Sequence, residues 1–175
     1  MDRHVPEIMA PAGDRASFLA GVAAGADAVY LGLKHFSARM QAKNFGLGEL
    51  SALTDYAHER GVRVHVAMNV LLKPDDARAA GGLMERLART VKPDALIVQD
   101  LGLMPLARQA GFEGDLHIST LANATHPAAL AVAQGLGASR VVLPRELDLD
   151  EVKLMAAACP QGLGLEVFVH GALCH

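Results

Sequence analysis

One pattern constrains the fold of this chain more than any other feature: a short apolar run, a turn and a segment of helical periodicity recur along the whole sequence. Seven apolar runs of this kind occur, at residues 7–10, 27–32, 62–69, 95–100, 116–120, 140–144 and 165–169. Strands that alternate with helices are typical of parallel sheets with right-handed crossovers. The runs are rich in Val, Ile and Leu, as strands buried on both faces require. The pattern therefore predicts an α/β fold.

The segments between the apolar runs carry helix signals. Apolar residues recur at helical spacing in residues 15–25, 49–61, 77–91, 103–111, 127–137 and 149–159. Asp14 is placed to cap the first of these helices. Glycines follow four of the segments, where a helix C-terminal cap is expected: Gly25, Gly61, Gly111 and Gly137. We therefore expect one helix between each pair of successive strands.

The number and spacing of these units favour a barrel. No Gly-x-Gly-x-x-Gly sequence follows the first strand, so a dinucleotide-binding sheet is disfavoured. A complete eight-unit barrel takes about 250 residues, whereas this chain has 175 and stops at its seventh strand. We expect residues 1–175 to form the N-terminal portion of a TIM-like (β/α) barrel, without an internal boundary. The open sheet edges would be completed by further chain, or by a partner such as a second copy.

Composition narrows the class of protein further. Trp is absent and aromatic residues make up 4%, so the core must be aliphatic. A net charge of −3 gives no sign of a generally basic surface, although a local patch could still bind RNA. Two cysteines make no disulfide framework. Neither a signal peptide nor a membrane helix is indicated, which predicts a cytoplasmic protein.

Polar residues gather where the predicted strands end, which is where a barrel places its site. The strand-end candidates are Asn69, Asp100, Arg145, Glu146 and His170. Each of the first four also has an ordinary structural explanation: Asn69 and Asp100 as caps, and Arg145 with Glu146 as a solvated ion pair. His65 and His117, inside strands, are expected to be packed or hydrogen-bonded rather than catalytic.

Among the predicted loops, the one after the second strand carries the charged residues that most strongly suggest an anion-binding site. Arg39, Lys43 and Asn44 could hold a carboxylate or a phosphate there, or form an ordinary charged surface loop. An aldolase-like or racemase-like barrel would need a lysine at a strand end, and Lys34 and Lys43 lie on this loop instead.

Familiar catalytic motifs are missing. The sequence has no HExxH, no GxxxxGK[ST] and no GxSxG. Cys174 with His170 or His175 could form a thiolate–imidazole pair or bind a metal, but the spacing is typical of neither. One such cysteine cannot hold an iron–sulfur cluster by itself.

The strand ends taken together resemble a known family. EIMAPAG, GADAVYLG, FSARMQAKNF, DALIVQDLGL, HISTLANATH, RVVLPREL and EVFVHGALC are similar, in this order, to segments of peptidase family U32, the collagenase-like proteases. Family members continue past HGALC with further cysteines, so the resemblance implies a longer protein. Several members resemble oxygen-independent hydroxylation factors for ribosomal RNA, transfer RNA or the ubiquinone ring. These are associated with an iron–sulfur cluster on four cysteines and with prephenate as oxygen donor.

This resemblance implies that Cys174 is the first cluster ligand and that the 175-residue chain is inactive by itself. From position alone, we expect Arg39 and Arg145 to engage carboxylates of substrate or donor. The remaining candidates would orient these groups or exchange protons: Asn44, Asn69, Asp100, Glu146 and His170. Two alternatives remain, a collagenase-like peptidase and a non-catalytic assembly partner.

Overall fold

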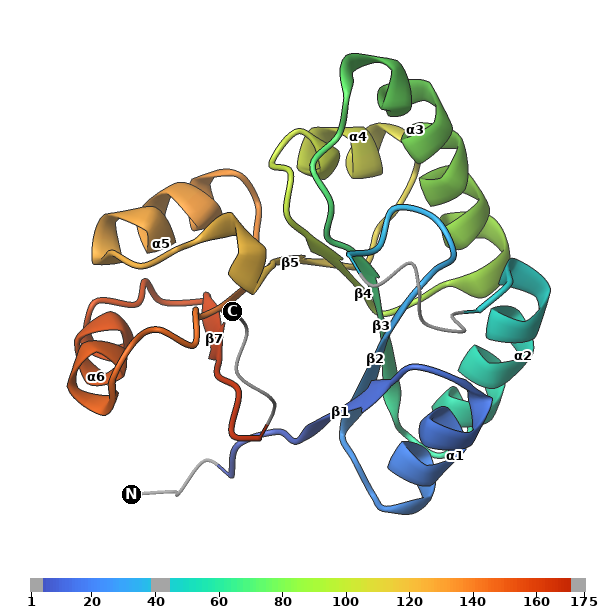
Figure 1. The fold of residues 1–175 in the computed structure, drawn as a ribbon, viewed down its shortest axis with the longest axis horizontal. Coiled ribbons are helices and arrows are strands. Elements are labelled where there is room, and N and C mark those ends of the chain that lie inside the picture. The colour runs from blue at the N-terminus through green and yellow to red at the C-terminus, as the bar shows by residue number, and fades with distance from the viewer. Residues whose placement is uncertain (1–4, 39–44, 171–175) are drawn as a thin grey trace.

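The structure, a computed structural model, describes residues 5–38 and 45–170 as seven parallel strands that alternate with helices (Figure 1). The strands are β1 (Met9–Ala12), β2 (Ala28–Gly32), β3 (Arg63–Met68), β4 (Ala95–Val98), β5 (Asp115–Ile118), β6 (Arg140–Val142) and β7 (Gly164–Glu166). The α-helices are α1 (Arg15–Ala23), α2 (Leu47–His58), α3 (Ala77–Arg86), α4 (Leu103–Gln109), α5 (Pro127–Gly135) and α6 (Leu149–Ala157). Every strand pairs only with its neighbours in sequence, so the strand order is that of a barrel.

Local sequence signals explain where the helices begin and end. Asp14 and Asp148 cap α1 and α6, each accepting hydrogen bonds from backbone N–H groups of the first turn. The predicted cap glycines Gly25, Gly61, Gly111 and Gly137 all have positive φ, between 70° and 89°. Positive φ costs glycine little because it lacks a Cβ atom. The helix can therefore end at these residues, and the backbone turns there towards the next strand.

The predicted elements are confirmed in type and order, and several of their bounds differ. The first strand spans Met9–Ala12 rather than residues 7–10, and the sixth ends at Val142 rather than at residue 144. Residues 77–91 do not form one α-helix, because α3 passes at Leu87 into a π-helical turn, Leu87–Val91, which ends on Lys92 at φ 53°. The last strand is shorter than residues 165–169 and spans Gly164–Glu166. The chain after Glu166 leaves the ladder, so Phe168 and His170 extend past the sheet.

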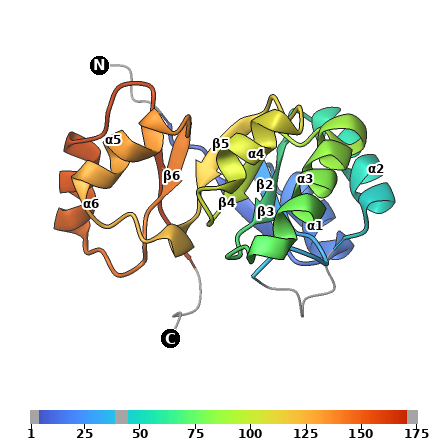
Figure 2. The same cartoon turned by 90° about the horizontal axis from the view of Figure 1, so that it is seen from above.

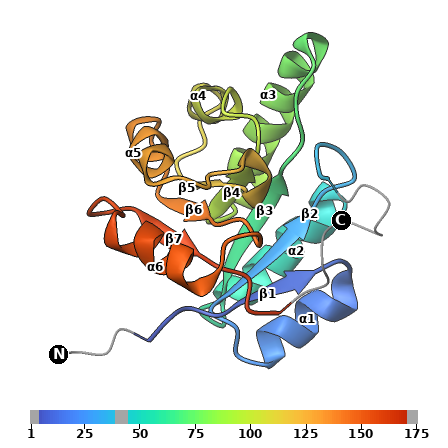
Figure 3. The same ribbon diagram turned by 60° about the vertical axis from the view of Figure 1, so that its left-hand side comes forward.

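The sheet is curled, and its helices lie on the outer side (Figures 1, 2 and 3). The main core fills the space between helices and sheet, and Phe18, Leu50, Met84 and Leu130 are among its fully buried side chains. Each such side chain contributes roughly 1.5–3 kcal/mol by leaving water. The TIM-like barrel prediction is therefore confirmed as a partial barrel of seven strands within the described part of the chain.

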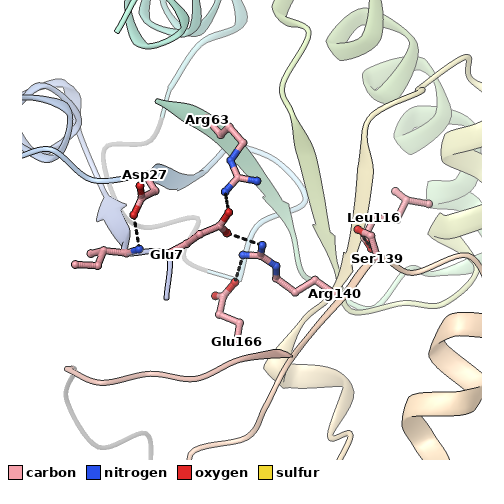
Figure 4. Close-up of polar contacts among 8 residues, drawn as sticks. Glu7, Asp27, Arg63, Leu116, Ser139, Arg140 and Glu166 are labelled. Carbon is pink, nitrogen blue, oxygen red and sulfur yellow. Dashed lines mark hydrogen bonds and ion pairs between the residues drawn. The ribbon is translucent and has the colours of Figure 1, made fainter. Parts of the chain in front are cut away.

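β1 and β7 are the two edges of this partial barrel, and each pairs on one side only. An ion cluster links the two ends of the sheet at the amino-terminal side of the strands (Figure 4). Glu7, just before β1, contacts Arg63 at the start of β3 and Arg140 at the start of β6. Arg140 also faces Glu166 at the end of β7. Side chains thus bridge from the segment before β1 to β6 and β7, although within residues 5–38 and 45–170 no backbone ladder joins β1 to either strand.

Candidate functional site

A small cavity lies inside the curl, at the carboxyl-terminal side of the strands. Its volume is about 50 Å³, which leaves room for a few water molecules or one small polar group. Six strands, β2 to β7, and their following loops contribute its lining: Tyr30, Ala67, Asn69, Ile97, Ser119, Thr120, Val142, Glu166 and Phe168. Apolar walls with a few polar groups are typical of a small-molecule site.

The strand registers explain which side chains share the inside of the curl. His65 is in register with Asp115, and His117 lies two residues further along β5. His117 is in turn in register with Gly164, and Glu166 lies two residues further along β7. This stagger is the one that places residues of alternate strands in one layer of a barrel. Bulky branched residues usually dominate such layers, whereas this one holds two histidines and a glutamate.

The two histidines of this layer are almost completely buried. Their rings meet edge to face with centroids 4.9 Å apart, and His65 and His117 are 1% and 2% exposed. The Nδ1 atom of each has no hydrogen-bond partner among the described residues. Burial lowers the pKa of His65 to about 4 and that of His117 to about 2, with the positive charge of Arg140 adding to both shifts. Both rings are therefore neutral at physiological pH, and the prediction that they are packed residues is confirmed.

Glu166 forms the charged part of the cavity lining. Its side chain is 18% exposed, and its Oε2 atom has no hydrogen-bond partner in the described chain. The nearest cation is Arg140, whose Nη1 lies 3.6 Å from Oε2, beyond hydrogen-bond range. Burial raises the pKa of Glu166, and the charge of Arg140 opposes that shift only in part. Glu166 therefore contributes a carboxyl group to the cavity lining, and its Oε2 atom is buried without a hydrogen-bond partner among the described residues.

Three neutral polar groups of the cavity come from two strand ends, those of β3 and β5. Asn69 accepts a hydrogen bond from the N–H of Ala38 through Oδ1, at 3.1 Å, so its side-chain amide still has N–H groups to donate. Ser119 Oγ accepts from the N–H of Leu121 at 3.2 Å. The Thr120 hydroxyl lies 3.4 Å from the carbonyl of Leu143. The cavity therefore combines one acceptor carboxyl with several hydroxyl and amide donors.

Asp100 lies elsewhere, in a wider groove of about 430 Å³ between the β3–α3 loop and α4. Its carboxylate accepts from the N–H of Gly102 at 2.9 Å and from the N–H of Leu72 at 3.1 Å. The groove is larger than the inner cavity, but its acidic group is committed to holding two loops together. We therefore place the candidate site in the inner cavity. Asp100 is not the cap of α4, whose N-cap is Gly102, and instead joins the two loops.

The other predicted residues fall into three groups. Arg145 places its guanidinium carbon 4.4 Å from the centre of the Phe168 ring, which lines the cavity. Glu146 and His170 are exposed. Arg39, Asn44 and Cys174 lie outside the described residues. Of the predicted set, the structure brings Asn69 into the cavity and Arg145 to its rim.

Tyr30 and Glu166 belong to the cavity but were not predicted from the sequence. Both lie within apolar strand runs, where strand-end reasoning does not look. The sequence nevertheless carried a signal for Glu166. Charged residues are rare in strands that are buried on both faces, and those that occur are usually paired or functional.

The described residues hold no group of three or more His, Cys, Asp or Glu side chains that could bind a metal. Cys159 is half-buried and its thiol lies 3.2 Å from the carbonyl of Leu163, and burial raises the pKa of this thiol. These residues therefore do not make up an iron–sulfur site. In the same part of the chain, no helix has the length and apolar character needed to cross a membrane.

The fold and cavity define an α/β barrel-type protein with a site inside the carboxyl-terminal end of its sheet. The model of peptidase family U32 matches residues 13–175, and the chain belongs to this family. It is similar to the solved structure titled "The Structure of the U32 Peptidase Mk0906", with a TM-score of 0.76 and 17% identity over 95% of this chain and 71% of that one.

Two curated relatives carry names that refer to RNA. The chain is 36% identical to tRNA hydroxylation protein P of Haemophilus influenzae, over 97% of this chain and 36% of that protein. It is 35% identical to the 23S rRNA 5-hydroxycytidine C2501 synthase of Escherichia coli, over 98% of this chain and 25% of that protein. The chain thus spans about a third or less of the length of these two relatives.

Proposed function

We propose that this chain is the barrel portion of an enzyme that hydroxylates a nucleoside of tRNA or rRNA. The observation that carries the proposal is the inner cavity, in which Glu166, Asn69 and Ser119 converge between apolar walls. The names of the two relatives support the choice of reaction. Such an enzyme would work where RNA is, in the cytoplasm.

The hydroxyl groups of the cavity favour this reaction over proteolysis. A serine or cysteine peptidase needs its nucleophile hydrogen-bonded to a base such as histidine. Ser119 instead accepts a backbone N–H, and Thr120 faces a backbone carbonyl. Among the described residues, no hydroxyl or thiol group is hydrogen-bonded to a histidine. The peptidase alternative is supported by the family name and by relatives named as proteases, such as the collagenase of Porphyromonas gingivalis, which is 32% identical over 96% of this chain.

The net charge of the chain is negative, so RNA would be attracted to the carboxyl-terminal face by a local group of cations. Exposed Lys34 and Lys73 lie on the β2–α2 and β3–α3 loops, and Arg145 lies on the β6–α6 loop. Cations on these loops would contact phosphates and orient the strand. A whole base exceeds the 50 Å³ cavity, so the edge of a base unstacked from its neighbours would enter while its ring stacks at the Phe168–Arg145 rim.

Cofactor and oxygen donor remain proposals on the family resemblance. Cys174 would be one ligand of an iron–sulfur cluster whose other ligands come from outside this chain, and the cluster would supply redox chemistry. A carboxylate donor such as prephenate would bind at the rim beside Arg145, since the Glu166 carboxylate would repel it from the inner wall.

The proposal is tested by nucleoside analysis of tRNA and rRNA from cells with and without the gene. We expect deletion to remove a nucleoside that is one oxygen atom heavier than its parent. The wild-type gene should restore it, and a Glu166→Gln gene should restore at most a small part. Unchanged nucleosides in the deletion strain would refute the proposal, and cleavage of peptides by the purified gene product would favour the peptidase instead.

A further inference from the structure

The ion cluster at the amino-terminal side of the sheet reaches into the cavity. Arg63, Glu7, Arg140 and Glu166 form a chain of alternating charge (Figure 4). Glu7, Arg63 and Arg140 lie at or just before the starts of strands. Residues on this side of a barrel usually contribute to stability rather than to catalysis. The fourth, Glu166, also lines the cavity. The cluster therefore extends from the amino-terminal side of the sheet to the cavity at its carboxyl-terminal side.

Arg140 is shared unequally between the two glutamates. Its Nη2 donates to Glu7 Oε2 at 2.7 Å, whereas its Nη1 lies 3.6 Å from Glu166 Oε2. The hydrogen bond from Arg140 is the main reason that the pKa of Glu7 is lowered. Glu7 also pairs with Arg63, which fixes it between two cations. Arg140 thus makes a hydrogen bond with Glu7 and a longer ion pair with Glu166.

We propose that Glu7 is a positioning residue for the cavity: by holding Arg140, it leaves the Glu166 carboxylate able to accept a hydrogen bond from an N–H or O–H group of the bound molecule. This inference deepens the proposed function, because it names what the cavity selects. The selected group is a hydrogen-bond donor, such as an amino or ring N–H group of a base edge. A carboxylate is disfavoured at this position.

The charges around Glu166 come from every element that packs against it. Arg140 faces it from β6 and Glu7 from the segment before β1, while the Tyr30 phenol shares the cavity from β2. His65 and His117 occupy the same barrel layer and are uncharged above about pH 4. Arg140 and Glu7 are therefore the two charges that set the state of Glu166. Removal of the Glu7 charge would let Arg140 turn to Glu166 and would also remove a repelling carboxylate.

The first test is a carboxyl titration by NMR of the full-length gene product with ¹³C-labelled glutamate. The signal that disappears in Glu166→Gln identifies Glu166. We expect this signal to titrate above the range of ordinary glutamates in the wild type and at lower pH in Glu7→Gln. Glu85→Gln is the matched control, because Glu85 makes an exposed ion pair with Arg89 on α3 and the π-helical turn, and it should leave the signal unchanged. An unshifted Glu166 signal in Glu7→Gln would overturn the proposal.

The second test is the pH dependence of the RNA reaction with the same variants. Glu166→Gln should raise KM by about 10-fold or more, the usual effect of losing a hydrogen bond to a charged group. Glu7→Gln should raise KM with little change in kcat and should move the acid limb of the kcat/KM profile to lower pH. A fall in kcat at unchanged KM and profile would mean that Glu7 is only structural. If the titration behaves as expected but RNA is not hydroxylated, the positioning role stands and the proposed function fails.

Discussion

The buried histidine pair predicts a steep loss of stability in mild acid. Folded His65 and His117 remain neutral down to about pH 4 and about pH 2 respectively. In the unfolded chain both titrate near the ordinary value of 6.5. The unfolded state therefore binds more protons below pH 6.5, and stability rises with pH and falls as the solution is acidified.

The magnitude follows from these pKa values. Between pH 7.5 and pH 5, protonation of the unfolded state lowers the free energy of unfolding by about 2 kcal/mol for each histidine, or ~4 kcal/mol for the pair. A domain is typically stable by only about 5–15 kcal/mol. The pair should therefore account for a large part of the acid sensitivity of this chain.

The assay is urea unfolding at a series of pH values, with the double variant His65→Phe/His117→Phe as the comparison. Phenylalanine retains a ring for the edge-to-face contact and cannot be protonated. The variant should lose most of the ~4 kcal/mol dependence between pH 7.5 and 5, whatever its stability at neutral pH. His35→Gln, which changes an exposed histidine, is the control and should retain the wild-type dependence.

Two results would refute this reasoning. One is a double variant whose stability depends on pH as strongly as that of the wild type. The other is an NMR titration in which either buried ring takes up a proton near pH 6.5 in the folded protein.

Further predictions concern packing, capping and the cluster ligand. Gly114→Ala should destabilise the fold by roughly 1–3 kcal/mol in urea unfolding, since its Cβ would lie 2.7 Å from the Asp94 carbonyl oxygen. Gly82→Ala, with open space around it on α3, should instead stabilise by up to ~1 kcal/mol, and a loss would contradict the packing described. Asp148→Ala should cost about 1 kcal/mol in thermal unfolding through loss of the α6 cap. In the full-length product purified without oxygen, Cys174→Ser should lower iron and sulfide per chain, and unchanged contents would remove Cys174 as a ligand.

The fold could be predicted from sequence because its signals are local. Apolar runs, helical spacing and four cap glycines each depend on neighbouring residues, and all point to the same alternating pattern. The π-helical turn after Arg86 was not predictable in this way, because its sequence continues the helical period of α3. Local signals thus fix the type and order of the elements better than their details.

The site was predictable only in part, because its contacts are not local. Glu7 and Arg140 are 133 residues apart in sequence, and only the curl of the sheet brings them together. Strand-end position selected Asn69, which lines the cavity, and also Asp100, whose carboxylate accepts from two backbone N–H groups outside it. A position at a strand end therefore shows that a residue lies near the site. Whether the residue lines the site depends on the direction of its side chain.

The most direct test of the proposed reaction is a side-by-side assay of the purified full-length gene product, kept free of oxygen. It would be given prephenate, the proposed oxygen donor, together with RNA from a strain that lacks the gene, and in parallel a collagen-derived peptide mixture. We predict that the RNA gains a nucleoside one oxygen atom heavier than its parent, that Glu166→Gln greatly reduces this gain, and that the peptides remain intact. Cleaved peptides with unmodified RNA would contradict the account.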